Sequence, residues 1–275
     1  QSTQIGGKRL RPPFKIHGGK HYLNKFVLEQ FPKNYEEYSY IEPFCGATSV
    51  FLNKNKSLKE EVISDIDDGI VDILRALRDC PKTFIKKIKR KKYSERVFTI
   101  ASNKEKNQEI KSPFDNAINE FILRRMSRGG LKKNFSWSNR LRGGIPGDVN
   151  AWLTIIDLLP EISERIQETY IFNKDYKEVI GAFNNKDSLV YCDPPYVSEA
   201  RVSKEVYKHE MTTDDHIDLA NLLNRFKGKA LISGYPSRLY NRLYSDWKCV
   251  RKKIVNHASQ QKSKKYQTEC LWINY

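Results

Sequence analysis

The chain has 275 residues and a formal net charge of +16, so it can bury a full core and we expect a polyanionic partner. No apolar stretch approaches the length of a membrane span and residues 1–11 are polar and basic, which argues against a membrane anchor or signal segment and favours a cytoplasmic protein. The cysteines show no close pairs, so we predict neither a disulfide framework nor a zinc site at Cys45, Cys80, Cys192, Cys249 and Cys270.

The first notable segment is Lys15-Ile16-His17-Gly18-Gly19-Lys20, which precedes the first expected helix. Its two glycines would let the backbone approach a ligand closely, and Lys20 offers a positive charge. By itself such a segment is more often a surface loop. It gains weight only together with the two motifs that follow.

A strand-like run over residues 38–41 leads into the small-residue turn Glu42-Pro43-Phe44-Cys45-Gly46 and an expected helix start, which together form a corner for an anion or nucleoside. A second strand over residues 62–66 contains Asp65, nineteen residues after Gly46. At that spacing an acidic side chain can accept hydrogen bonds from the ribose of an adenosine-containing cofactor. One glycine is weak evidence, but the pair of corners predicts nucleoside binding.

A basic block follows the helix expected over residues 68–78. Between Lys86 and Ile145 there are 17 Lys and Arg against 5 Asp and Glu, which is +12 of the net +16. The lysine-rich run over residues 86–92 is better explained as a solvated face. Residues 124–142 instead combine glycines, cations and the rings of Phe135 and Trp137, which favours nucleic-acid contact. The residues predicted to bind DNA are Arg124, Arg125, Arg128, Lys132, Lys133, Asn134, Arg140 and Arg142.

Further strands are expected over residues 170–172, 189–192 and 230–233, with helices over 114–126 and 213–226. This alternation predicts an α/β fold with a mostly parallel sheet, interrupted by a basic, mostly helical insertion. Thr212 followed by Asp215 is typical of a helix start, so we interpret His216 as a helix residue rather than a ligand.

The most informative motif is Asp193-Pro194-Pro195-Tyr196, which directly follows a short apolar run. The two prolines cannot donate to a β-ladder, so the strand ends near Asp193, at the sheet edge where open α/β folds bind ligands. A carboxylate, the Pro194 carbonyl and a tyrosine ring suit a planar group that carries an NH2, such as a nucleobase. Taken alone, this motif would be explained about equally well by an ordinary Asp-Pro turn after a buried strand.

The order of these motifs resembles the Dam-type DNA adenine methyltransferases, with similarity to a branch met in bacteriophages and mobile elements. The resemblance rests on Gly-Gly-Lys, Glu-Pro-Phe-x-Gly-Ala-x-Ser-Val-Phe-Leu, Asp-Ile-Asp, a variable basic insertion and Asp-Pro-Pro-Tyr, and it covers about residues 11–275. It implies a Rossmann-like, S-adenosylmethionine-dependent methyltransferase core over residues 8–82 and 165–275. Residues 83–164 would be the target-recognition insertion for double-stranded DNA.

The resemblance also implies roles for individual residues. S-adenosylmethionine would be held by Lys20, Glu42, Pro43, Phe44, Cys45, Gly46, Asp65, Ile66 and Asp193. The target adenine would be flipped into a pocket formed by Asp193, Pro194, Pro195 and Tyr196, because the amine of a paired adenine is engaged inside the duplex. No metal, covalent intermediate, membrane or obligate protein partner is implied.

Four positions differ from the family's pattern. Ile16 and His17 replace a Trp-Ala pair, and Thr48 replaces the second glycine of the cofactor turn. If residues 125–131 align with the DNA-reading hairpin, Lys133 stands where GATC-specific relatives use arginine. Lysine lacks the bidentate fork that reads guanine, so the sequence does not predict GATC as the target.

Two other interpretations remain open. One is an amino methyltransferase for cytosine, RNA adenine or protein glutamine, although Asp193 and the insertion favour adenine in DNA. The other is a DNA-binding relative that has lost catalysis, which the intact Asp65 and Asp193-Pro-Pro-Tyr196 argue against.

Overall fold

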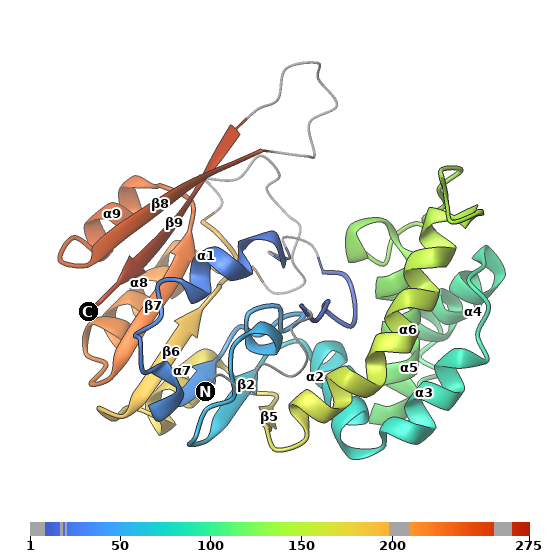
Figure 1. Cartoon of the computed structure of the whole chain (residues 1–275), viewed down its shortest axis with the longest axis horizontal. Coiled ribbons are helices and arrows are strands. Elements are labelled where there is room, and N and C mark those ends of the chain that lie inside the picture. The colour runs from blue at the N-terminus through green and yellow to red at the C-terminus, as the bar shows by residue number, and fades with distance from the viewer. Residues whose placement is uncertain (1–8, 17–18, 20, 198–209, 256–265) are drawn as a thin grey trace. The chain divides into compact units, whose positions relative to one another are not determined.

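A computed structural model describes residues 9–16, 19, 21–197, 210–255 and 266–275 (Figure 1). The chain forms two compact units. The first contains Gln1–Asn24, Cys45–Asn55 and Asp67–Asn173, and the second contains Lys25–Phe44, Lys56–Ile66 and Lys174–Tyr275. The predicted insertion lies within the first unit, while the predicted core contributes to both. His17, Gly18 and Lys20 lie outside the described residues.

The second unit is built on a mostly parallel sheet, which confirms the predicted fold class. Its strands lie in the order β2-β1-β6-β7-β9-β8; β2, β1, β6 and β7 are parallel, and β9 runs antiparallel to both of its neighbours, β7 and β8. Every residue of β1, β2 and β6 is buried, as expected for a parallel sheet covered on both faces. The bounds are β1 Ser39–Glu42, β2 Glu61–Ser64, β6 Ser188–Cys192, β7 Lys229–Gly234, β8 Lys248–Val255 and β9 Tyr266–Ile273.

Short helices accompany this sheet: α7 (Tyr176–Ala182), α8 (Thr213–Asn224), α9 (Arg238–Leu243) and the 3-10 helix η2 (Tyr35–Glu37). Helix α1 (Asn24–Leu28) begins at the boundary between the units. The Thr212 hydroxyl accepts from the Asp215 backbone N–H at 3.1 Å and the Asp215 carboxylate accepts from the Thr212 N–H at 2.8 Å, so the expected capping pair starts α8. His216 is buried within that helix, with Nδ1 2.9 Å from the Tyr240 hydroxyl oxygen.

The first unit is mostly helical. Phe121 on the central helix α5 packs edge-to-face on Phe84 of α3 at 5.6 Å and against Trp152 of α6 at 5.7 Å between ring centroids, so three helices share one aromatic core. Its elements are α2 Asp68–Asp79, α3 Pro81–Lys89, α4 Glu95–Lys106, α5 Pro113–Met126, α6 Gly147–Ile166, β3 Leu141–Arg142, β4 Ile145–Pro146, β5 Tyr170–Phe172 and the 3-10 helices η1 His21–Leu23, η3 Phe51–Asn53 and η4 Arg128–Gly130. No helix within the described ranges is both long and apolar enough to cross a membrane.

One expected element is wrong. The α-helix expected directly after the turn at Gly46 does not form. The chain makes turns there, and the 3-10 helix η3 follows. The cause is the backbone of Thr48, which has a φ of +57° and donates its N–H to the Cys45 carbonyl at 2.7 Å. A β-branched residue in this left-handed region interrupts helical geometry.

Candidate active site

Three predicted site carboxylates lie at one edge of the sheet in the second unit. Glu42 ends β1, Asp65 follows β2 and Asp193 follows β6. Strand β1 lies between β2 and β6 and is parallel to both, so the carboxyl ends of all three strands meet at the same edge (Figure 1). The sheet therefore brings two of the predicted cofactor residues, Glu42 and Asp65, to the same edge as the predicted catalytic residue Asp193.

Glu42 is held from within its own strand. Its side chain is 3 % exposed, and the Tyr40 hydroxyl donates to Glu42 Oε2 at 2.7 Å. Burial, with the neighbouring Glu42, raises the pKa of Tyr40 well above its ordinary value. Tyr40 therefore remains a proton donor at neutral pH and keeps the Glu42 carboxylate in a fixed orientation.

Asp193 is oriented by the neighbouring strand β7. The Ser233 hydroxyl donates to Asp193 Oδ1 at 2.6 Å, and the Tyr191 hydroxyl donates to Ser233 Oγ at 3.4 Å. Burial and then the nearby Asp193 raise the pKa of Tyr191, so this hydroxyl stays protonated at neutral pH. A carboxylate has about four lone-pair sites, so a single carboxylate can accept hydrogen bonds from a serine hydroxyl and from an amine at the same time.

The other end of the Asp-Pro-Pro-Tyr motif is anchored as well. Pro194 is buried and Pro195 half-buried. Tyr196 is 5 % exposed, its hydroxyl donates to Glu269 Oε2 at 2.8 Å, and its ring meets Tyr235 edge-to-face at 4.4 Å. Ser233, Tyr235 and Glu269 lie on or just after neighbouring strands, and the sequence alone did not identify them.

The second unit also offers the chemistry that an adenosine-containing cofactor needs. Glu42 and Asp65 supply carboxylate acceptors for hydroxyl and amine groups. Ile66 is 48 % exposed beside Asp65, and Phe44 is half-buried and stacks on Tyr176 at 5.2 Å. Acceptors next to exposed apolar surface fit a ribose joined to a flat base. Pro43 is buried between Glu42 and Phe44.

The rest of the predicted cofactor turn belongs to the first unit. Cys45 and Gly46 are buried, and Gly46 has a φ of +46°. A β-carbon at Gly46 would lie 2.5 Å from Ile16 Cδ1, so Ile16 packs directly on this turn. Thr48 takes a positive φ where the family's pattern has glycine, and its hydroxyl donates to the Ala47 carbonyl at 2.7 Å. The turn thus keeps a glycine-like backbone with a threonine side chain.

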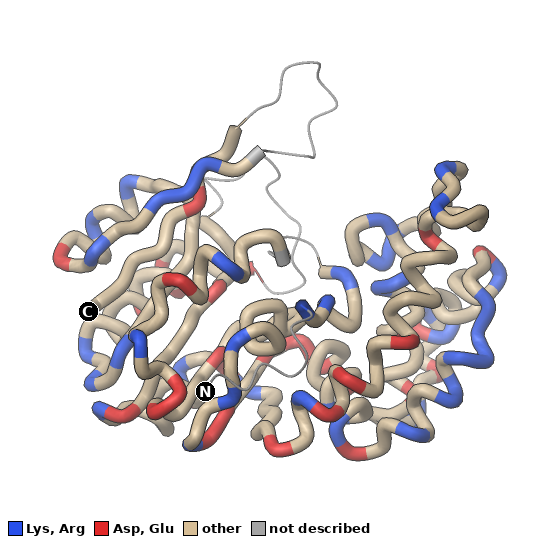
Figure 2. Tube along the Cα trace, in the orientation of Figure 1, with Lys and Arg blue, Asp and Glu red and all other residues tan. Residues whose placement is uncertain are grey.

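The residues predicted to bind DNA divide into two groups by exposure. The solvent-exposed members are Arg128, Lys133, Asn134, Arg140 and Arg142. Ser127 and Phe135 pair in an antiparallel bridge, and the Arg128 N–H donates to the Asn134 carbonyl at 3.3 Å, which closes residues 127–135 into the expected glycine-rich loop. Figure 2 shows the cations along this unit.

The remaining three cations have partners inside the first unit. Arg124 is 7 % exposed and binds Asp67 Oδ2 at 2.9 Å and Glu120 Oε2 at 2.8 Å. Lys132 pairs with Glu105 at 2.6 Å and also with Glu120. Arg125 donates to the Ala151 carbonyl at 2.9 Å, and burial lowers its pKa to about 10, so it is still charged at neutral pH. Their contact with DNA stays a prediction.

A second exposed element lies further along the insertion. Strands β3 and β4 form a hairpin whose turn, Gly143-Gly144, has φ values of +59° and +79°, as type I′ turns require. Leu141 is 63 % exposed beside Arg142, and Trp137 is 55 % exposed and stacks on Phe135 at 6.4 Å. The insertion therefore presents exposed cations together with an exposed ring.

The closed loop packs on the segment that precedes the predicted cofactor lysine. Gly130 has a φ of +74°, and a β-carbon there would lie 2.2 Å from the Lys15 carbonyl oxygen. Gly129 has a φ of +61° but nothing within 4 Å of the corresponding position. Both glycines therefore have a left-handed backbone, but only at Gly130 is there no room for a side chain.

Gly130→Ala is expected to lower the free energy of unfolding by about 3 kcal/mol, because the left-handed backbone and the collision with Lys15 both oppose the methyl group. The matched control Gly129→Ala should cost only about 1–2 kcal/mol, from the backbone alone. Urea unfolding of both variants measures the difference. Equal losses would show that the contact with Lys15 does not constrain the loop.

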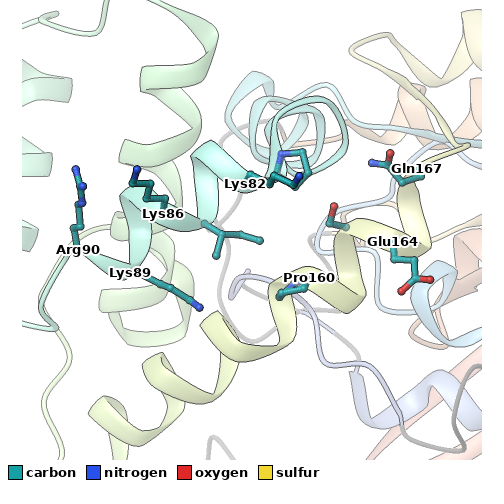
Figure 3. A pocket seen from close by; sticks show the side chains of 10 residues that line it. Lys82, Lys86, Lys89, Arg90, Pro160, Glu164 and Gln167 are labelled. Carbon is teal, nitrogen blue, oxygen red and sulfur yellow. The ribbon is translucent and has the colours of Figure 1, made fainter.

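An open pocket of about 700 Å³ lies between α3 and α6 of the first unit (Figure 3). On one side it is bordered by Lys82, Lys86 and Lys89 of α3 and by Arg90 directly after that helix. On the other side it is bordered by Pro160 and Glu164 of α6 and by Gln167 directly after that helix. None of the predicted catalytic, cofactor or DNA-binding residues lines it.

Comparison with known proteins gives a consistent set of similarities. Residues 17–261 match the model of the D12 class N6 adenine-specific DNA methyltransferases. The chain is 24 % identical to a DNA adenine methylase of Haemophilus influenzae, over 95 % of this chain and 92 % of that protein. It is also 24 % identical to the type II methyltransferase M.MjaIII of Methanocaldococcus jannaschii, over 97 % and 99 %, and 25 % identical to a DNA adenine methylase of Vibrio cholerae, over 86 % of each chain.

Proposed function

Because the chain belongs to the D12 class N6 adenine-specific DNA methyltransferase family, we propose that its Asp193-Pro-Pro-Tyr196 segment methylates a flipped adenine in double-stranded DNA. The activity of the family is methyl transfer from S-adenosylmethionine to the exocyclic amine of adenine in DNA. The base must leave the duplex because a paired amine is shielded inside the stack. The proposal therefore assigns residues to a bound base and a bound cofactor.

Asp193 and Pro194 act on the amine. The Asp193 carboxylate and the Pro194 carbonyl accept the two amino hydrogens, which favours a pyramidal nitrogen with a lone pair freed from the ring. That nitrogen forms a bond to a methyl carbon as the carbon–sulfur bond breaks, and it then loses a proton, for which Asp193 is an acceptor. Tyr196 stacks on the flipped base, and Pro195 stiffens the segment between them.

S-adenosylmethionine supplies an electrophilic methyl group on a sulfonium. Asp65 accepts hydrogen bonds from its ribose, Ile66 and Phe44 line its adenine, and Glu42 provides a further carboxylate. Pro43, Cys45 and Gly46 form the turn beside it, and Lys20 is assigned to it through the family's Gly-Gly-Lys motif. The acceptors next to exposed apolar surface at Ile66 support this assignment.

The observation that carries the proposal is the meeting of Glu42, Asp65 and Asp193 at one sheet edge, with Asp193 already oriented by Ser233. Unmethylated genomic DNA should be incubated with the protein and S-adenosylmethionine, and modified bases mapped by direct long-read sequencing. N6-methyladenine at one recurrent sequence is expected. Methylcytosine, or DNA without any modified base, would overturn the proposal.

The target sequence is assigned to the insertion, through Arg128, Lys133, Asn134, Arg140 and Arg142. Exposed cations can contact phosphates, and the Asn134 amide or the Lys133 amine can reach base edges. Trp137 adds an exposed stacking surface beside them. Arg124, Arg125 and Lys132 carry the same charge but are engaged by groups of the protein itself.

Lys133→Ala should weaken DNA binding and reduce the slope of log K against log salt by about 1, because one cation leaves the interface. If Lys133 reads a base, the loss will differ among oligonucleotides. Lys132→Ala is the matched control, since its side chain pairs with Glu105 and Glu120, and its slope should stay unchanged. A salt titration that is unaltered by Lys133→Ala would remove Lys133 from the interface.

A further inference from the structure

The Asp-Pro-Pro-Tyr segment is held at both ends by neighbouring strands. At its start, Asp193 accepts from Ser233 of β7 at 2.6 Å. At its end, the Tyr196 hydroxyl donates to Glu269 Oε2 of β9 at 2.8 Å. Strands β7 and β9 are paired, with Gly234 opposite Cys270, so the two anchors belong to one continuous piece of sheet (Figure 1).

Glu269 is an unusual residue for its position. It is only 1 % exposed, on a strand where the next four residues, Cys270, Leu271, Trp272 and Ile273, are also buried. Burying a carboxyl group costs free energy unless hydrogen bonds compensate. An apolar residue would fill such a site at a lower cost in free energy. We therefore interpret the hydrogen bond from Tyr196 as the reason for a carboxyl group at this position.

The Tyr196 ring is restrained in two directions. Its hydroxyl is fixed by Glu269, and its ring meets the Tyr235 ring at an interplanar angle of 82° and 4.4 Å between centroids. The first contact fixes the far end of the side chain, and the second opposes rotation of the ring. The plane of the ring is thus set by the protein in the absence of a base.

We propose that Glu269 is a positioning residue that fixes the plane of the Tyr196 ring for stacking on the target base, an inference that rests on the proposed function. A pre-oriented ring removes the entropy cost of ordering it when the base arrives, and it holds the amine at the correct distance from Asp193. Glu269 acts through Tyr196 and touches neither base nor cofactor.

The test compares single-turnover methyl transfer on an oligonucleotide that carries the mapped target site. Tyr196→Phe deletes the hydroxyl, Glu269→Leu deletes the acceptor, and Glu269→Gln keeps an acceptor. We expect Tyr196→Phe and Glu269→Leu each to slow the step about tenfold, with unchanged Kd for S-adenosylmethionine, and Glu269→Gln to stay within about twofold of wild type. The double variant, Tyr196→Phe with Glu269→Leu, should be no slower than either single variant, because both remove the same bond.

Tyr240→Phe is the matched control, since it removes another buried tyrosine hydroxyl, the one next to His216, and should leave the rate unchanged. A wild-type rate in Tyr196→Phe, or effects of the two single variants that multiply in the double variant, would overturn the role of Glu269. Tyr196→Phe decides the question even if Glu269→Leu does not fold. An inactive wild-type protein would instead contradict the proposed function, so the two failures are distinguishable.

Discussion

Asp193→Ala is expected to reduce methyl transfer by about 10³-fold or more while the protein remains folded. The variant loses the acceptor that orients the amine and takes up charge during transfer, and positioned groups of this kind contribute about 10²–10⁴ in rate. Asp193 is half-buried at a strand end rather than in the core, so truncation should cost little stability. Radiolabelled methyl incorporation and thermal unfolding measure the two quantities.

The matched control is Asp187→Ala, which removes an exposed carboxylate that pairs with Lys59 at 3.2 Å. An exposed pair of this kind contributes about 0–1 kcal/mol, so both activity and unfolding should stay close to wild type. Calorimetry of S-adenosylmethionine binding to Asp193→Ala shows whether the variant has lost the methyl-transfer step alone or has also lost affinity for the cofactor. Near-normal turnover in Asp193→Ala would remove this residue from the mechanism.

The strand ends that carry the site were predictable because their signals are local. The apolar run before Asp193 is short and ends at two prolines, and Asp65 follows a comparable run. In a parallel sheet, knowing where strands end is enough to place their following residues at one edge. The carboxylates Glu42, Asp65 and Asp193 could therefore be grouped from the sequence.

The groups that orient those carboxylates were not predictable in the same way. Ser233 and Glu269 reach the motif because β7 pairs with β6 and β9 pairs with β7. Strand order is set by contacts between residues far apart in the chain, and no local pattern encodes it. The only signal in the sequence was a glutamate, Glu269, directly before the apolar run over residues 270–273.

Strand β8 and helix α6 are among the elements that the sequence did not predict, and each was missed for an identifiable reason. Strand β8 contains Lys248, Arg251, Lys252 and Lys253, which do not suggest a strand, but it lies at the edge of the sheet, where charges discourage pairing with another chain. Helix α6 contains Pro160, a residue that normally ends a helix. In both cases tertiary context prevails over local preference.

The basic insertion shows a different limit. A count of charges treats Arg124 and Arg128 alike. In the structure, however, Arg124 is buried between two carboxylates and Arg128 is exposed. Charge counting predicts that a segment is basic, whereas the partners of each cation depend on how α5 packs in the unit. The prediction of a nucleic-acid surface therefore narrows to the exposed cations.

Arg124→Ala is expected to lower the free energy of unfolding by about 3–5 kcal/mol, because it leaves Asp67 and Glu120 without the buried cation that they share. Asp67 also caps α2, accepting from the Gly69 N–H at 3.0 Å, so a displaced carboxylate would weaken the start of that helix. Urea unfolding measures the loss.

The exposed Arg128→Ala, in the same segment, is the matched control and should change stability by less than about 0.5 kcal/mol. The pair also separates the two roles available to these arginines. A structural Arg124 gives a large loss of stability and, in the fraction that remains folded, an unchanged salt dependence of DNA binding. If Arg124 instead contacts phosphate, its replacement should reduce the salt slope by about 1, as expected for Arg128, with little effect on unfolding. Because each outcome moves a different measurement, one pair of variants decides whether Arg124 belongs to the scaffold or to the interface.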